Sequence, residues 1–168
     1  MRTSIASILT IMLIALTTRT ATAHCQIPCG IYGDLTRARL LREHVTTLEK
    51  SIKMIGELSA KKDRTAADDN QLVRWIANKE QHADAMRDIV VEYFLQQRVK
   101  APAADDAAGA KRYAGLLAVC HELLVTSMKA KQSVDSTIPA KLRGQLERLE
   151  ALYFSEADLE HLGEHHGK

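Results

Sequence analysis

Apolar side chains recur at steps of three and four residues in four separate stretches of this 168-residue chain. Such spacing places them along one side of a helix. The stripes comprise Leu41, Val45, Leu48, Ile52 and Ile55; Leu72, Ile76, Ala83, Met86, Val90 and Tyr93; Tyr113, Leu117, Cys120 and Leu124; and Leu142, Leu146, Leu149 and Tyr153. The second stripe is regular only when Lys79 is passed over. Because strand-like alternation is lacking, the sequence predicts an all-α fold.

The segments between the stripes carry residues that are typical of helix starts. Residues 61–69, "KKDRTAADD", contain Asp68 and Asp69 as candidate N-caps, and Pro139 in "SVDSTIPAK" suits a first helical turn. "KAPAADDAAG", residues 100–109, forms the remaining break. Connections this short favour antiparallel neighbours. We therefore expect an up-down-up-down four-helix bundle over residues 34–160, followed by a frayed, His-rich C-terminal tail at 161–168.

The first 23 residues have the pattern of a signal peptide. Arg2 precedes an apolar run, and the small residues Ala21 and Ala23 stand three and one positions before a candidate cleavage site. The apolar run is shorter than the roughly 20 residues that a membrane span needs. We therefore expect an exported protein, periplasmic or extracellular, that has no membrane segment after cleavage and begins at His24.

Charge and cysteine content exclude some functions. Removing Arg2 and Arg19 with the signal peptide leaves 21 basic and 21 acidic side chains. This balance gives no support to nucleic-acid binding, which requires a concentrated basic face. Three cysteines, an odd number, argue against a disulfide framework.

Residues 24–33, "HCQIPCGIYG", are incompatible with a regular helix because Pro28, Gly30 and Gly33 interrupt them. We expect this segment, called the hook from here on, to be a compact loop at the end of the bundle. A turn at Pro28 brings Cys25 and Cys29 together. One reading is a small structural disulfide.

A metal site is the alternative reading of the hook. Cleavage after Ala23 gives His24 a free amine, an imidazole and a following amide, all next to the Cys25 sulfur. An amine with a reference pKa of about 7.7 to 8.0 can lose its proton to a metal near neutral pH. Two thiolates with two nitrogens suit square-planar nickel or copper better than tetrahedral zinc.

The hook pattern H-C-x-x-P-C-G-x-Y at a processed N-terminus resembles the nickel-containing superoxide dismutases. The matching residues are His24, Cys25, Pro28, Cys29, Gly30 and Tyr32. A looser similarity extends through "NKEQHA" at 78–83 and "YFLQQRVK" at 93–100.

The resemblance implies a ligand set and an activity. One nickel ion per subunit is expected on the sulfurs of Cys25 and Cys29, the His24 amine and the backbone amide nitrogen of Cys25, with the His24 imidazole as axial ligand of the oxidised state. Tyr32 is expected at the substrate opening. The family converts superoxide to oxygen and hydrogen peroxide by Ni(II)/Ni(III) cycling, and a homohexamer is expected.

Two departures from the family pattern stand out. A glutamate and an arginine that orient the axial imidazole in well-known members correspond here to Leu41 and His82, with Glu43 or His82 as candidate substitutes. The family commonly loses a short leader to a dedicated protease, whereas here an export signal precedes the hook. We therefore expect signal cleavage itself to expose His24, and nickel to be loaded outside the cytoplasm.

The other candidate residues have simpler interpretations. Cys120 lies on an apolar stripe and is expected to be a buried free thiol. His44 and His121 flank stripes and are expected to be surface or satisfied histidines. His161, His165 and His166 could chelate a metal adventitiously.

Three other functional classes account for the sequence less completely. A di-iron bundle enzyme needs Glu-x-x-His pairs, and the sequence has none. A nickel or copper carrier without turnover would not need Tyr32 or the Pro28-Cys29-Gly30 turn. A structural bundle with a Cys25–Cys29 disulfide leaves the processed histidine unexplained.

Overall fold

The computed structural model describes residues 33–163, without the side chains of residues 161 and 163. This part of the chain is all-helical, as the sequence predicts. The helices are α2 (Asp34–Ser59), α3 (Ala66–Asp88), the π-helix η1 (Ile89–Arg98), α4 (Ala107–Gln132), α5 (Ile138–Tyr153) and α6 (Glu156–Gly163). The expected signal peptide and all of the hook except Gly33 lie outside the described residues.

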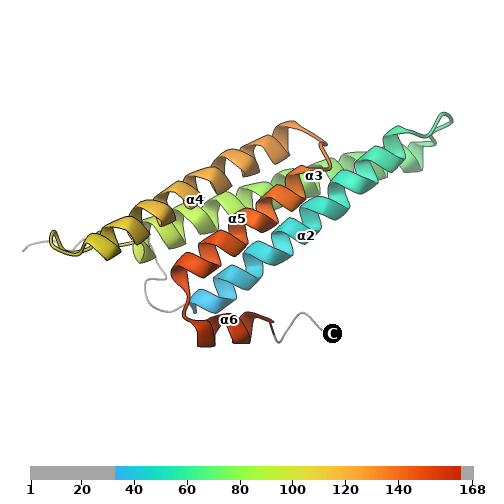
Figure 1. The fold of residues 1–168 in the computed structure, drawn as a ribbon. Coiled ribbons are helices and arrows are strands. Elements are labelled where there is room, and N and C mark those ends of the chain that lie inside the picture. Colours follow the sequence, from blue (N-terminus) through green and yellow to red (C-terminus); the bar gives the residue numbers. More distant parts are fainter. Residues whose placement is uncertain (1–32, 164–168) are drawn as a thin grey trace, which may run out of the picture.

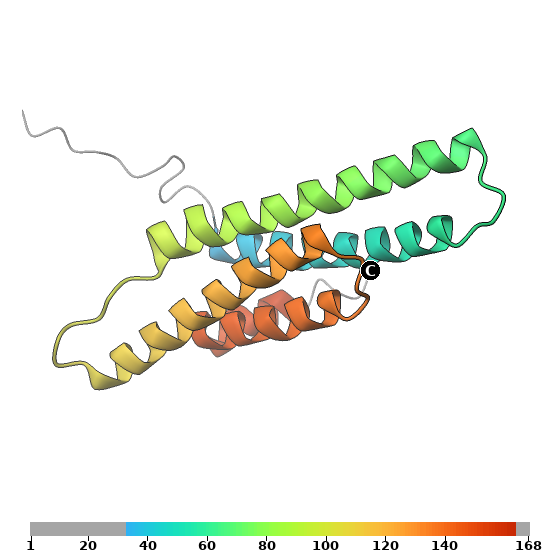
Figure 2. The same ribbon diagram turned by 90° about the horizontal axis from the view of Figure 1, so that it is seen from above.

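The four long helices form an antiparallel bundle. Each packs against the next along the chain, and α5 returns to contact α2 (Figure 1). The α2–α3 hairpin is longer than its neighbours and projects beyond the ends of α4 and α5 (Figures 1 and 2). α2 begins at the opposite end, where η1 and α5 finish. The hook therefore joins the bundle at that end.

The core confirms the apolar stripes of α2 and α5. All five predicted α2 residues are buried, as are Leu142, Leu146 and Leu149, while Tyr153 is half-buried. In α3 and η1, the stripe residues Ala83, Met86, Val90 and Tyr93 are buried as predicted, but Ile76 is exposed. Ile76 lies on the projecting hairpin, where no other described helix covers this face of α3.

The predicted stripe of α4 is wrong by one residue at two positions. Leu116 and Leu123 are buried, whereas Leu117 is 38% exposed and Leu124 is only partly buried. The sequence has adjacent leucines at both places, so either register gives a continuous apolar stripe. Packing of α4 between α3 and α5 selects the register that buries Leu116, Val119, Cys120 and Leu123.

Side-chain caps begin α3 and α4. Thr65, not Asp68 or Asp69, is the N-cap of α3: its hydroxyl accepts a hydrogen bond from Asp68 N at 3.2 Å, and Thr65 N donates to Asp68 Oδ2 at 3.0 Å. This reciprocal pair is a capping box. Asp106 caps α4 by accepting from Gly109 N at 2.8 Å. Pro139 lies in the first turn of α5, as predicted.

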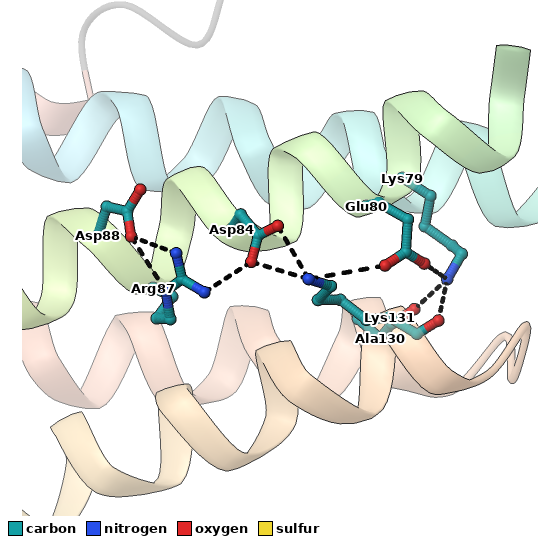
Figure 3. A network of polar contacts seen from close by, with 7 residues as sticks. All are labelled: Lys79, Glu80, Asp84, Arg87, Asp88, Ala130 and Lys131. Atoms are coloured by element: carbon teal, nitrogen blue, oxygen red, sulfur yellow. Dashed lines mark hydrogen bonds and ion pairs between the residues drawn. The ribbon is translucent and has the colours of Figure 1, made fainter.

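Lys79 explains the interruption in the second stripe. Its side chain is buried on α3, and its ammonium donates to the carbonyl oxygens of Ala130 at 2.6 Å and Lys131 at 2.5 Å (Figure 3). These carbonyls belong to the last turn of α4, where a helix has no internal donors left. Lys79 therefore occupies a core position because it caps a neighbouring helix.

Residues 161–163, the start of the expected frayed tail, belong to a helix, whereas residues 164–168 lie outside the described residues. α6 spans Glu156–Gly163 and contacts α2, with Leu162 buried against the bundle. Among the described residues, no helix combines the length and apolar character needed to cross a membrane.

Candidate functional site

The predicted site residues His24, Cys25, Cys29 and Tyr32 all lie outside the described residues. What the structure shows is the part of the bundle from which the hook extends. Gly33 is the first described residue and the N-cap of α2, with an extended backbone at φ −77° and ψ 136°.

The carboxylate of Asp34, the first residue of α2, binds three side chains from two other helices. Tyr93 donates to Oδ1 at 2.5 Å and Tyr153 donates to Oδ2 at 2.8 Å. Arg98 Nε forms an ion pair with Oδ1 at 2.9 Å, and its Nη2 donates to the Tyr93 hydroxyl at 3.0 Å. We call these four residues the Asp34 cluster. It joins α2, η1 and α5 one residue after Gly33.

The π-helix η1 positions two members of this cluster. In a π-helix the backbone hydrogen bonds join residues i and i+5, which places side chains five apart on the same side. Tyr93 and Arg98 are five apart, and the Val99 N–H donates to the Phe94 carbonyl in this pattern at 2.8 Å. π-Helical turns occur frequently at functional sites. Apolar periodicity in the sequence gave no sign of this widened turn.

The Asp34 cluster keeps its tyrosines protonated. Burial raises the pKa of Tyr93, and the hydrogen bond to the negative Asp34 carboxylate raises it further. The pKa of Tyr153 is raised by the same two causes in the same order. Phe94 packs edge-to-face against both rings, with centroid distances of 5.5 and 5.4 Å. Both hydroxyls therefore remain donors to Asp34 at neutral pH.

A shallow cleft of about 540 Å³ opens beside the start of α2. Gly33, Asp34 and Tyr153 line it together with two arginines, Arg39 and Arg112. Arg112 Nε and Nη2 donate to the carbonyl oxygens of Leu152 and Tyr153, at 2.6 and 2.9 Å. Two carboxylates, Asp34 and Asp158, line the same cleft, so they balance the charges of the two arginines.

Two histidines meet between α2 and α3. Nδ1 of His44 lies 2.8 Å from Nδ1 of His82, with the rings edge-to-face at 5.0 Å. One nitrogen must carry the proton while the other accepts it. The pKa of His44 is lowered, first by burial and then by the neighbouring His82. His44 is thus a satisfied histidine, one of the two alternatives predicted, but its partnership with His82 was not anticipated.

Comparison with known proteins identifies the family. The family model described as nickel-containing superoxide dismutase matches residues 19–157, which include the whole hook and nearly all of the bundle. No curated protein and no solved structure gave a significant match.

The chain belongs to the nickel-containing superoxide dismutases. This confirms the resemblance inferred from the hook sequence, and the chain is a nickel-dependent oxidoreductase that acts on superoxide. The alternatives of a metal carrier and of a purely structural bundle are not favoured.

The described part of the bundle offers no candidate metal site. Within residues 33–163, no three His, Cys, Asp or Glu side chains lie close enough to hold a metal ion. Cys120 is a fully buried free thiol, as predicted, and burial raises its pKa to about 11. The other two cysteines, Cys25 and Cys29, lie outside the described residues.

The two positions that lack the family's support for the axial imidazole, Leu41 and His82, have different surroundings in this dismutase. Leu41 is fully buried in the core, so it contributes packing and no polar contact. His82 is half-buried and hydrogen-bonded to His44, while Glu43 is exposed. His121 is exposed, as expected. The side chain of His161 and all of His165 and His166 lie outside the described residues.

Proposed function

We propose that each subunit of this superoxide dismutase holds one nickel ion in the hook, residues 24–33. The ligands are the thiolates of Cys25 and Cys29, the α-amine of His24 and the backbone nitrogen of Cys25, with the His24 imidazole joining in the oxidised state. The observation that carries this proposal is the complete burial of Cys120, which disfavours that thiol as a ligand and favours Cys25 and Cys29. The family match over the hook supports it.

Bound nickel supplies the redox couple, Ni(II)/Ni(III), that oxidises one superoxide to oxygen and reduces another to hydrogen peroxide. Electron-rich thiolate and amide donors stabilise its higher charge. Tyr32, three residues after Cys29, orders water at the opening and limits access to it.

The polar residue that supports the His24 imidazole from the bundle is His82 in this proposal. Leu41 is excluded from that task because it is buried in the core. The hydrogen bond from or to His44 fixes the orientation of the His82 ring. An oriented imidazole can hold a neighbouring ring by a single hydrogen bond, as second-layer partners do at metal sites.

Export and maturation are coupled in this proposal. Cleavage after Ala23 removes the signal peptide and creates the amine of His24 in one step. The protein then takes up nickel in the periplasm or outside the cell. The signal peptide must therefore be cut directly before His24, with no additional residue left on the mature chain.

We also propose a homohexamer. The hook has only ten residues and cannot build a core of its own, so docking against neighbouring subunits would order it. The α2–α3 hairpin projects from the bundle (Figure 2). It offers apolar surface for such contacts, because Val73 and Ile76 of α3 are 64% and 42% exposed. These exposed residues support assembly but do not determine the number of subunits.

Three cysteine variants test the ligand assignment. Cys25→Ser and Cys29→Ser should each lose nickel and superoxide turnover while far-ultraviolet circular dichroism shows the helices intact. Cys120→Ala is the matched control and should keep both nickel and turnover. Adding one residue before His24 should act like the hook variants, because it converts the amine ligand into an amide. Full activity in Cys25→Ser or Cys29→Ser would overturn the assignment.

A further inference from the structure

We propose that Asp34 is a positioning residue that fixes the point at which the nickel hook leaves the bundle. This inference rests on the proposed function, since it assumes that residues 24–33 hold the metal. Asp34 stands five residues after Cys29 and two after Tyr32, with Gly33 immediately before it. Consecutive Cα atoms are held about 3.8 Å apart, so a displacement of Asp34 is passed directly to these neighbours.

The contacts of Asp34 differ from those of an ordinary first-turn carboxylate. Such a carboxylate usually interacts with the free N–H groups of its own helix. Here both oxygens are directed to other helices, to Tyr93 and Arg98 on η1 and to Tyr153 on α5. These partners are 59, 64 and 119 positions away in the sequence. Three points of attachment on two helices restrain translation and rotation of the first turn of α2.

The chemistry of the cluster makes it sensitive to the charge of Asp34. Tyr93, Tyr153 and Arg98 all present N–H or O–H donors to the carboxylate, and a carboxylate is purely an acceptor. In Asp34→Asn the side chain keeps its shape but loses the negative charge that pairs with Arg98, and one acceptor oxygen becomes an NH₂ donor. The substitution therefore disrupts the cluster with little change in volume.

Asp84 provides a matched control. It too is an interhelical carboxylate with similar exposure, 35% against 33% for Asp34, and it binds Lys131 of α4 at 2.8 Å (Figure 3). Asp84 lies one turn before the end of α3, far along the sequence from the hook. If Asp34 contributed only general stability, Asp34→Asn and Asp84→Asn would have the same effects.

The experiment compares these two variants by nickel release and by hydrogen exchange. Nickel-loaded wild type, Asp34→Asn and Asp84→Asn are each mixed with excess chelator, and nickel loss is followed in the absorption bands of the bound metal. Amide hydrogen exchange of residues 24–33 is measured on the metal-free proteins by mass spectrometry. We expect Asp34→Asn to release nickel at least about tenfold faster and to exchange faster in the hook, whereas Asp84→Asn behaves as wild type. Tyr153→Phe, which removes one donor, should show an intermediate effect.

Equal nickel release and equal hook exchange in Asp34→Asn and Asp84→Asn would overturn the positioning role. If Asp34→Asn fails to fold, Tyr153→Phe takes its place in the comparison with Asp84→Asn, and equal nickel release and hook exchange would again overturn the role. Failure of the proposed function gives a different result, because Cys25→Ser would then retain nickel as wild type does. If Cys25→Ser loses nickel but Asp34→Asn releases it no faster than wild type, only the positioning role is rejected.

Discussion

In the folded dismutase, Cys120 should react with thiol reagents more slowly than the hook cysteines, because a smaller fraction of it is ionised. A thiol reacts as its thiolate, and burial raises the pKa of Cys120 to about 11. At pH 8 this leaves about one thiolate in a thousand, against about one in four for an ordinary thiol of pKa near 8.5. Ionisation alone therefore slows Cys120 by about 200-fold, and its complete burial slows it further.

Thiol counting with a chromogenic disulfide reagent measures this difference. The metal-free, reduced protein should show two fast thiols under native conditions and three after unfolding. Cys120→Ala should keep the two fast thiols and lose the third. Nickel loading should protect the two fast thiols without changing the third.

Two results would contradict the reasoning. One is a Cys120 that reacts in the folded protein as fast as the hook cysteines. The other is nickel loading that protects Cys120 and leaves Cys25 or Cys29 reactive. The first would show that Cys120 is neither buried nor suppressed in its ionisation, and the second would place a sulfur ligand in the bundle instead of the hook.

Two further predictions concern buried polar groups of the bundle. Lys79→Met should lower the free energy of unfolding by about 2 to 4 kcal/mol in denaturant titrations, because two carbonyls near the end of α4 lose charged donors. The control Lys131→Met removes more exposed ion pairs and should lower it by about 1 kcal/mol or less. Equal losses in the two variants would contradict the capping role of Lys79. Stability should also fall below about pH 6.5, because the pKa of His44 is lowered in the folded state and the unfolded chain binds the proton first. His44→Gln should reduce this slope in unfolding measurements between pH 7.5 and 5.5, and an unchanged slope would argue against the assignment to His44.

Much of the bundle could be predicted because each helix buries one periodic stripe. The predictions failed where two answers fit the same pattern or where a polar residue occupied the core. The paired leucines of α4 allowed two registers, and only contacts with α3 and α5 decide between them. Lys79 broke the pattern because its partner carbonyls lie 51 and 52 residues away.

The site was predictable where its chemistry is local in sequence. His24, Cys25 and Cys29 stand within six residues, and their spacing was enough to suggest the family. The Asp34 cluster joins residues 34, 93, 98 and 153, and it depends on a π-helical turn that apolar periodicity does not reveal. The His44–His82 pair likewise requires two helices to be placed side by side.

Mass spectrometry of the native exported protein, with metal analysis of the same sample, tests the central claim most directly. The account predicts a chain that begins at His24, carries reduced Cys25 and Cys29, and holds one nickel ion per subunit. A metal-free chain with a Cys25–Cys29 disulfide that, once reduced, takes up no nickel under anaerobic conditions would contradict it. So would an active protein that keeps residues before His24.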